Sequence, residues 1–436
     1  DGDQIHLCKS KGKVSVLEEK FIEAGIPKAQ LGIGHTRWAT HGVPNDVNSH
    51  PHASNNGNLV MVHNGIIENY ATLKKELIAR GYTFHSDTDT EVLINLIEEV
   101  KKIENVKLGK AVQLALKQVT GAYAIAVFDI QKPDEIVVAK LGSPLAIGIG
   151  DNEYFIASDA TPFLEFTKNA IYLDDNEMAI LRLGRAPRLR ELNKDQSIAP
   201  VIHKLTMNLE QIEKGGYEHF MLKEIHEQPQ AIRDTFRGRL LPEEGLIKLS
   251  GLDDHLKKFV NADRIIIVAC GTSWHAGLVA EYIFEEWARI PVEVEYASEF
   301  RYRNPIISNK DVVIAISQSG ETADTLAAIK LAKSRGAFVY GVCNVAGSSI
   351  ARETDSGSYT HAGPEIGVAS TKAFTTQITI LTLIALKLAK EKGSVSESIY
   401  RQHIAEIQLI PELVQEALLA NDVIKAIAAE FKSAKN

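Results

Sequence analysis

The sequence predicts two kinds of structure in succession: an α+β unit with antiparallel sheets, then an α/β unit with a doubly wound parallel sheet. Up to about residue 205, short β-rich runs follow one another through loops, with helical stretches among them, which favours sheets covered by helices. From about Leu240, strands and helices alternate, as in βαβ units. A length of 436 residues agrees with two or three domains.

In the first half, the predicted strands are rich in β-branched and aromatic residues and are separated by Gly, Pro or Asp-Asn pairs. They cover residues 59–62, 123–130, 135–140, 145–150, 154–158 and 170–173. Helical periodicity predicts helices over 68–79, 89–102 and 107–118. The charged stretch 182–218 is expected to be irregular and to begin an interdomain connection.

In the second half, continuous apolar runs indicate buried parallel strands. These strands are expected at 265–270, 292–297, 312–317 and 338–343, and helices at 271–287, 323–334 and 396–435. Such sheets bind ligands beyond the carboxyl ends of their strands. The apolar stretch 373–386 is interrupted by threonines and a glutamine, so we expect no membrane-spanning segment there.

Composition and charge exclude several classes of protein. Apolar residues make up 45% and charged residues 24%, which is ordinary globular usage. Lys plus Arg number 48 against 56 Asp plus Glu, a net charge of −8, so the basic surface of a nucleic-acid binder is not expected. Cys8, Cys270 and Cys343 are far apart, which argues against a disulfide framework or a thiolate zinc site and predicts a reducing, cytoplasmic location.

Two loops combine hydroxyl groups and glycine between a strand and a helix. They are Ser317-Gln318-Ser319-Gly320-Glu321-Thr322 and Cys270-Gly271-Thr272-Ser273. Helix N-termini with such loops bind phosphate, because unpaired N–H groups and the helix dipole favour an anion. The alternative is that each hydroxyl group merely caps its helix. Neither loop has the GxGxxG or GxxxxGK[ST] pattern of nucleotide sites.

The polar loops of the first half suggest an acyl-transfer pocket. Arg37 is suited to hold a carboxylate through its guanidinium fork. Asn64-Gly65 is either an Asn-Gly turn or an oxyanion hole made of a side-chain amide and a backbone N–H. Asp89 is either a helix cap or the partner of a substrate ammonium. The nearby histidines form only a weak metal pattern, and Cys8 lacks the local partner that a nucleophile needs.

Several long strings, taken in order, resemble the isomerising glutamine:fructose-6-phosphate amidotransferase family. In the first half the strings are HTRWATHG, HPH, VHNGIIEN, SDTDTE and LGSPL; in the second half they are ACGTS, ASEFRYR, SQSGETADT and EIGVASTKAF. YEHFMLKEIHEQP, residues 217–229, is similar to the interdomain linker of that family. The resemblance implies a class II glutaminase of N-terminal-nucleophile (αββα) fold over 1–208, a linker over 209–239, a first sugar-isomerase domain over 240–392 and a helical connection over 393–436.

The resemblance also implies roles for residues in the first half. Arg37 would bind the α-carboxylate of glutamine and Asp89 its ammonium, with Thr40 and His41 lining the pocket. Asn64 and Gly65 would form the oxyanion hole. The residue expected to gate the passage of ammonia toward the sugar is Trp38.

In the second half, the resemblance implies a sugar-phosphate site. The residues that would form it are Ser273, Ser317, Gln318, Ser319 and Thr322, with Val368 and Ser370 nearby. Ammonia from glutamine would attack the keto carbon of open-chain fructose 6-phosphate, and a base would then move a proton to give glucosamine 6-phosphate. The resemblance implies a homodimer without a metal or an organic cofactor.

In that family the nucleophile is an N-terminal cysteine, and a second sugar-isomerase domain follows the first. We expect both to lie outside the 436 residues, with an early arginine that contacts glutamine, so the chain by itself is expected to be inactive. Robust glutamine hydrolysis by this chain would contradict that expectation.

Two other functions compete with this interpretation. One is a different class II amidotransferase, for example one that supplies ammonia to phosphoribosyl pyrophosphate, but 317–322 has a single Glu where an acidic pair is expected. The other is a non-catalytic sugar-phosphate sensor, which would have no need of Arg37, Asn64 or Asp89. Separate titrations with glutamine and fructose 6-phosphate distinguish the sensor, because it should ignore the amino acid.

Overall fold

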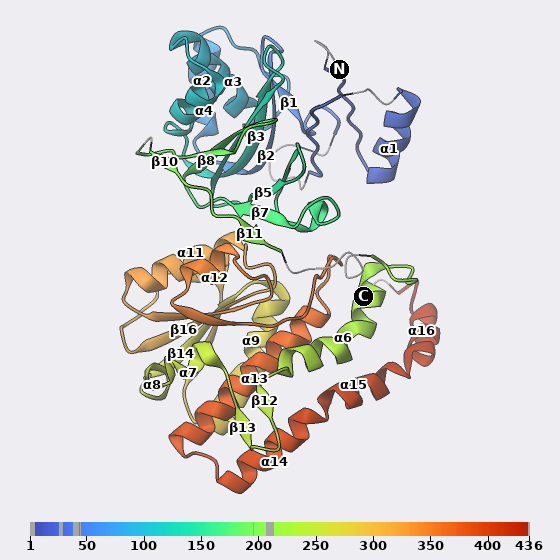
Figure 1. The fold of residues 1–436 in the computed structure, drawn as a ribbon, viewed down its shortest axis with the longest axis vertical. Coiled ribbons are helices and arrows are strands. Elements are labelled where there is room, and N and C mark those ends of the chain that lie inside the picture. Colours follow the sequence, from blue (N-terminus) through green and yellow to red (C-terminus); the bar gives the residue numbers. More distant parts are fainter. Residues whose placement is uncertain are drawn as a thin grey trace. The chain divides into compact units, whose positions relative to one another are not determined.

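The computed structural model describes residues 5–25, 29–37, 43, 45–194, 196–205 and 213–434. The chain divides into two units, Asp1–Thr206 and Met207–Asn436 (Figure 1). Trp38, Thr40 and His41, three of the predicted site residues, lie outside the described residues.

The first unit contains a seven-stranded antiparallel sheet in the order β1-β2-β3-β4-β8-β9-β10. Its strands are β1 (His52–Ala53), β2 (Leu59–Ile67), β3 (Gly121–Asp129), β4 (Glu135–Leu141), β8 (Glu177–Arg182), β9 (Arg188–Glu191) and β10 (Ser197–Ile198). Alternation of side chains across β3 fixes its two faces: Tyr123 and Ile125 pack toward helices, Ala124 and Ala126 toward a second sheet.

The second sheet of this unit has four antiparallel strands in the order β11-β7-β5-β6. They are β5 (Ala146–Ile149), β6 (Tyr154–Ala157), β7 (Asn169–Tyr172) and β11 (His203–Lys204). Ile147 and Ile171 face the larger sheet, whereas Ala146 and Ala170 pack with Phe163 of the short helix η1 (Thr161–Phe163). Two sheets stacked face to face with helices outside them confirm the expected fold, although the outer helical layer described is only η1.

Three helices cover the free face of the seven-stranded sheet (Figure 1). They are α2 (Tyr70–Ala79), α3 (Asp89–Ile103) and α4 (Leu108–Leu116); a further helix, α1 (Val14–Glu23), has no buried residue. α3 is buried along most of its length, including Val92, Leu93 and Ile97, which accounts for its place at the centre of this core.

The stretch expected to be irregular contains three short strands, β9, β10 and β11, so that expectation was wrong. In β9 only Leu189 is buried, and the arginines on either side of it are exposed. Such a short strand buries too few apolar residues to leave an alternating pattern in the sequence.

The second unit is built on a five-stranded parallel sheet in the order β15-β14-β16-β17-β18, as predicted. The strands are β14 (Arg264–Ala269), β15 (Val292–Tyr296), β16 (Asp311–Ser317), β17 (Phe338–Cys343) and β18 (Ser356–Tyr359). β18 was not predicted, because its Ser-Gly-Ser-Tyr sequence lacks an apolar run. A hairpin of β12 (Leu240–Leu241) and β13 (Leu246–Ile247) precedes the sheet.

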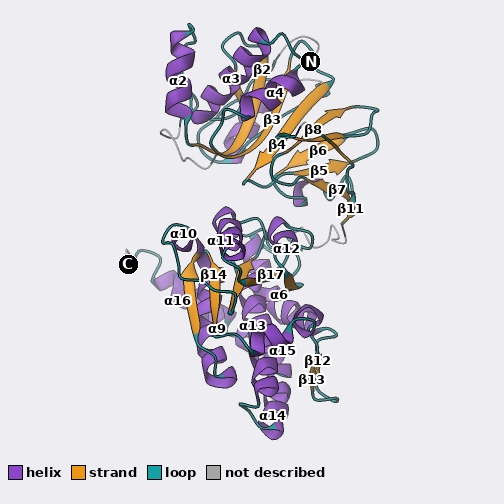
Figure 2. Ribbon diagram, turned by 90° about the vertical axis from the view of Figure 1, so that its left-hand side faces the viewer, coloured by secondary structure: helices purple, strands orange, loops and turns teal. Residues whose placement is uncertain are grey.

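Helices cover both faces of this sheet, giving three layers (Figure 2). On one face Ile265 and Ile267 pack with α6 (Phe220–Phe236), α9 (Gly271–Ile283) and α13 (Lys372–Lys392). On the other, Ile266 and Val268 pack with α10 (Ala297–Phe300), α11 (Ala323–Ser334) and α12 (Ser349–Glu353). Two short helices, α7 (Ser250–Asp253) and α8 (Leu256–Val260), precede β14. The predicted helix to residue 287 ends as α9 at Ile283 and continues as one π-helical turn, Phe284–Ala288.

Helix α13 extends beyond the apolar stretch 373–386 at both ends and was not among the predicted helices. By length and composition alone, this helix could cross a membrane, but 72% of its most apolar window is buried inside the protein. It packs against α6 and α9, and its threonines bond to backbone carbonyls of the helix, as Thr379 Oγ1 does to Thr375 O at 2.8 Å. α13 is therefore the core helix of the second unit.

The C-terminal stretch 396–435, expected as one helix, is divided into three. They are α14 (Glu397–Gln408), α15 (Ile410–Leu418) and α16 (Asn421–Glu430). The first break falls at Leu409, two residues before Pro411, whose ring has no N–H to donate within a continuous helix.

The turn from β16 to α11 depends on a glycine. Gly320 has φ +67°, and a Cβ there would lie 1.9 Å from Ser348 Oγ. Gly393, which follows α13, has the same φ of +67°, but a Cβ there would meet nothing within 4 Å. Substitution of Gly393 therefore tests backbone strain alone, whereas substitution of Gly320 tests backbone strain and steric overlap together.

We predict that Gly393→Ala lowers the free energy of unfolding of the second unit by about 1 to 2 kcal/mol, the cost of a left-handed alanine. Gly320→Ala should cost about 1 to 3 kcal/mol more, because Ser348 must also be displaced. Denaturant unfolding followed by circular dichroism measures both. Equal effects of the two substitutions would contradict the steric argument.

Candidate functional site

Asn64 and Gly65 lie inside strand β2 and not in a turn, so the Asn-Gly turn alternative was wrong. β2 pairs with β3 along its whole length, well beyond the predicted end at residue 62. Gly65 has φ +137°, and a Cβ there would lie 2.1 Å from the carbonyl oxygen of Ala122. Glycine is required at this position because the neighbouring backbone leaves no room for a side chain.

The side-chain amide of Asn64 is oriented by His35. Asn64 is exposed, and its Oδ1 lies 2.6 Å from His35 Nε2. Burial lowers the pKa of His35; the bond to Asn64 opposes this effect, and the charge of Arg37 adds to it. With its oxygen on the imidazole, the amide keeps its NH2 group as the donor that an oxyanion needs.

Three further histidines lie near His35: His52 and His63 are buried, and His50 is half-buried. His63 N–H donates to His50 Nδ1 at 3.3 Å, and His63 Nδ1 lies 3.0 Å from Thr90 Oγ1. His52 Nε2 lies 3.2 Å from Thr88 Oγ1. Burial lowers the pKa of all three, that of His52 to about 4. Their side chains take part in hydrogen bonds, and among the described residues no group of three or more His, Cys, Asp or Glu could hold a metal ion.

Asp89 begins helix α3 but does not cap it. The cap is Thr88, whose side chain accepts a hydrogen bond from Glu91 N at 3.3 Å, so the capping alternative for Asp89 was wrong. Asp89 is 4% exposed, and its Oδ2 accepts a hydrogen bond from Ile67 N at 2.8 Å. The carboxylate therefore lies at the end of the strand that carries Asn64.

Arg37 lies in the same part of the unit. Its charge contributes to the lowered pKa values of His35, His50 and His52, and its Nη1 lies 3.5 Å from Val43 O. The structure thus groups Arg37, Asn64, Gly65 and Asp89 around the histidines. A cation, an amide donor, a backbone N–H and an anion in one place match the charge pattern of a zwitterionic amide substrate.

Two of the three cysteines have thiols whose pKa is raised by burial. All are free; burial raises the pKa of Cys270, and that of Cys343 to about 12. Thiols held protonated at pH 7 are poor nucleophiles. Cys8 is half-buried in the first unit.

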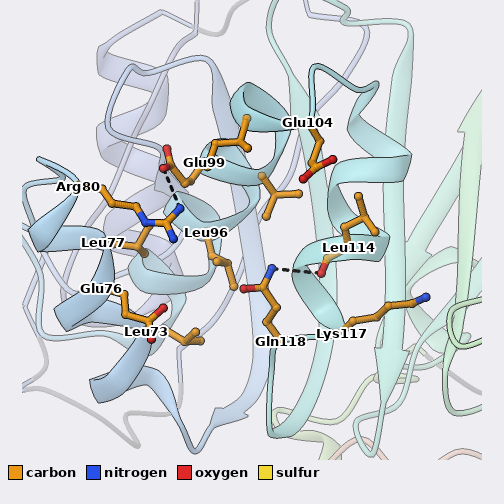
Figure 3. Close-up of a pocket in the computed structure, with 12 residues that line it drawn as sticks. Leu73, Glu76, Leu77, Arg80, Leu96, Glu99, Glu104, Leu114, Lys117 and Gln118 are labelled. Carbon is orange, nitrogen blue, oxygen red and sulfur yellow. Dashed lines mark hydrogen bonds and ion pairs between the residues drawn. The ribbon is translucent and has the colours of Figure 1, made fainter.

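A cavity of about 620 Å³ opens between α2, α3 and α4 (Figure 3). Leucines and charged side chains line it, and on its wall Arg80 Nη1 lies 3.2 Å from Glu99 Oε1. Gln118 Nε2 donates to Leu114 O at 3.5 Å. Arg37 and Asp89, the described residues among those predicted to bind glutamine, do not line this cavity.

In the second unit, the loop after β16 is folded through its own hydroxyl groups. Ser317 Oγ accepts a hydrogen bond from Gly320 N at 3.0 Å and lies 2.9 Å from Thr322 Oγ1. Ser319 Oγ accepts from Glu321 N at 3.1 Å. Thr322 is the N-cap residue of α11, yet its side chain makes no capping bond, so simple capping does not account for this loop.

The loop after β14 also lacks a side-chain cap, since Cys270 makes none to α9. Ser273, within the first turn of α9, is buried, and its Oγ accepts a hydrogen bond from Gln377 Nε2 at 3.0 Å. Gln377 is 1% exposed and comes from α13. Sequence reasoning missed this support, because a single polar residue in an apolar helix has no periodicity of its own.

These two loops lie at the switch point of the sheet. β14 and β16 are parallel neighbours, with Val268 opposite Ala315, and the chain extends from β14 to β15 on one side and through β16 to β18 on the other. α9 and α11 consequently start from adjacent strand ends and cover opposite faces. At such a point the helix N-termini converge on an opening suited to a phosphate.

Val368 and Ser370 lie in the loop between β18 and α13. Val368 is 98% exposed and Ser370 half-buried. Asn344 connects this region to the β16 loop, because its N–H donates to Gln318 O at 3.2 Å and its Nδ2 to Gly363 O at 2.6 Å.

Sequence reasoning also missed Glu224 of α6, which holds the loop of Val368 and Ser370. Its Oε1 accepts hydrogen bonds from the backbone N–H groups of Ile366 and Gly367. The signal available was the pair of glutamates at 224 and 227, three residues apart and thus on one face of a helix.

Comparison with known proteins places both units. A family model described as "Glutamine amidotransferase domain" matches residues 23–220, and one described as "SIS domain" matches residues 258–387. The solved C-terminal domain of glucosamine-fructose-6-phosphate aminotransferase from Francisella tularensis is 42% identical, with a TM-score of 0.48, over 51% of this chain and 62% of that one.

Curated relatives match along the whole chain. Glutamine–fructose-6-phosphate aminotransferase (isomerizing) of Bacteroides thetaiotaomicron is 55% identical over 436 residues, which are 100% of this chain and 71% of the relative. The enzyme of the same name from Chlorobaculum tepidum is 54% identical over 99% of this chain and 70% of its own length. The chain therefore belongs to the glutamine–fructose-6-phosphate aminotransferase (isomerizing) family, whose members convert fructose 6-phosphate to glucosamine 6-phosphate with nitrogen from glutamine.

Proposed function

We propose that the first unit binds glutamine and the second binds the phosphate of fructose 6-phosphate through the residues predicted from the sequence. The observation that carries this proposal is the placement of the two hydroxyl-rich loops, 270–273 and 317–322, at the switch point of the parallel sheet. Hydroxyl groups and helix N-termini at such a point suit a dianionic group and leave no place for the acidic pair expected of a phosphoribosyl site.

In the glutamine pocket, Arg37 pairs with the α-carboxylate and Asp89 with the ammonium. Asn64 Nδ2 and Gly65 N–H stabilise the oxyanion that forms when the side-chain amide is attacked. The contact of Asn64 with His35 supports this role, because it orients the amide before substrate arrives. Thr40 and His41 complete the pocket in this proposal, and Trp38 gates the ammonia.

In the sugar-phosphate site, Ser273, Ser317, Ser319 and Thr322 bind the phosphate. Gln318 adds a donor, and Val368 and Ser370 contact the sugar. Ammonia attacks the keto carbon of the open-chain sugar, the keto oxygen leaves as water to give an imine, and transfer of a proton from C1 to C2 then gives the aldose. No metal or organic cofactor is needed for these steps. A homodimer in the cytoplasm, with the domain boundaries 1–208, 209–239, 240–392 and 393–436, completes the proposal.

We predict that Ser319→Ala combined with Thr322→Ala weakens fructose 6-phosphate binding by a few kcal/mol, at about 1 to 3 kcal/mol for each lost bond to a charged group. Calorimetric titration measures the affinity. Ser334→Ala, at the other end of α11, is the control and should leave it unchanged. Unaltered binding by the double variant would remove the phosphate assignment.

Arg37→Lys should weaken glutamine binding at least tenfold, because an ammonium cannot reproduce the two parallel bonds of a guanidinium to a carboxylate. Titration with glutamine tests this. Arg80→Lys, at an exposed arginine that pairs with buried Glu99 in the same unit, serves as the matched control. Intact glutamine affinity in the Arg37 variant would refute the carboxylate role.

The neutral histidines predict acid sensitivity of the first unit. The pKa of His52 falls from 6.5 to about 4 on folding, so below pH 6.5 the unfolded chain binds the proton more readily. Stability contributed by neutral His52 is complete above pH 6.5 and declines by about 3 kcal/mol as the pH falls to about 4, at about 1.4 kcal/mol for each pH unit. Urea unfolding between pH 7 and pH 4 measures this decline.

His52→Gln should remove the part of that decline due to His52, about 3 kcal/mol between pH 6.5 and pH 4, whereas His6→Gln, at an exposed position of the same unit, should leave the profile unchanged. A profile that is flat in the unsubstituted chain would show that His52 titrates normally in the folded state.

A further inference from the structure

The loop that carries Val368 and Ser370 is fixed at its base and exposed at its tip. Val368 is 98% exposed, so an apolar side chain stands in solvent at the tip. At the base, Glu365 Oε1 accepts hydrogen bonds from Thr371 N at 2.8 Å and from Ala373 N at 3.0 Å. The loop therefore closes on itself just before α13 begins.

A buried carboxylate from α6 holds the first part of the loop, at residues 366 and 367. Glu224 is 2% exposed, and its Oε1 accepts hydrogen bonds from Ile366 N at 2.6 Å and Gly367 N at 2.9 Å. Two N–H donors to one ionised oxygen are stronger than neutral hydrogen bonds. A Cβ on Gly367 would lie 2.5 Å from Glu224 Oε2, so the carboxylate leaves no room for a side chain at this position.

A second glutamate of α6 holds the end of the loop, where α13 begins. Glu227, one turn after Glu224, accepts a hydrogen bond from Lys372 Nζ at 2.7 Å. Lys372 is 3% exposed and is the first residue of α13. α6 thus holds the segment 366–372 at two points, neither of which is in the phosphate loops.

We propose that Glu224 is a positioning residue for recognition of the sugar: by fixing the amides of residues 366 and 367, it sets where Val368 and Ser370 meet the hexose. This inference rests on the proposed sugar-phosphate site. Burying a carboxylate costs free energy unless hydrogen bonds to its charged oxygens offset that cost. The two loop amides donate such bonds to Glu224. The phosphate loop 317–322 has its own internal hydrogen bonds and does not depend on Glu224.

The experiment compares two ligands on the same chain by calorimetric titration: fructose 6-phosphate, which would use both loops, and inorganic phosphate, which would use only the loops after β14 and β16. Glu224→Ala should weaken fructose 6-phosphate binding at least tenfold and change phosphate binding less than twofold. Glu224→Gln should lie between, because its amide oxygen can still accept from the loop but carries no charge.

Gly367→Ala tests the same contact from the other side, since its methyl group would push the loop away from Glu224 while the charge remains. It should show the same selective loss. Glu412→Gln, on an exposed ion pair with Arg233, is the control and should bind both ligands normally.

Equal loss of both ligands in Glu224→Ala and Gly367→Ala would mean that Glu224 only supports the fold, and the inference would be overturned. Unchanged binding of both ligands would also overturn it. If the unsubstituted chain binds neither ligand, the proposed phosphate site itself fails, which separates that failure from a failure of Glu224.

Discussion

The reversal of strand order at β14 and β16 is the constraint on which the second unit depends. Both faces of these strands are covered by apolar side chains, so their helices must leave on opposite sides. In a sheet of this kind an opening lies between the ends of two such strands, and no later part of the chain has to fill it. Ser273 and Ser317 are brought near this opening by the register of the sheet, each at the end of its own strand.

In the first unit the predicted site residues that the structure describes lie along and beside one antiparallel strand, with Asp89 buried and Asn64 exposed. Asn64 and Gly65 sit in a strand whose neighbours fix the backbone, and Asp89 ties the start of α3 to that strand. Charged histidines in this place would oppose the cation Arg37. Burial keeps them neutral, so the same packing fixes the backbone and prevents repulsion between the histidines and Arg37.

Much of this architecture was predictable where burial is uniform. β16 and β17 were predicted within one residue, and α11 at its observed bounds, because continuous apolar runs have only one place in such a fold. The end of β2 was missed, since His63 and Asn64 interrupt the apolar pattern that marks a strand. The site residues on loops were predicted by their chemistry and by resemblance.

The partners of the supporting residues were beyond sequence reasoning for a physical reason. Glu224 and Gln377 are polar residues in helices, where the ordinary expectation is a solvated face. Only the three-dimensional packing shows that their partners are backbone amides in a loop and a serine in another helix. A hydrogen bond between segments more than a hundred residues apart leaves no local trace.

The position of helix α6 has a consequence for the loop that carries Val368. The helix begins at Phe220, the residue at which the match to the glutamine amidotransferase model ends. In its second turn, Glu224 accepts a hydrogen bond from the backbone N–H of Gly367, next to Val368. A displacement of α6 would therefore also displace the backbone amides of Ile366 and Gly367, because both donate to Glu224 of this helix.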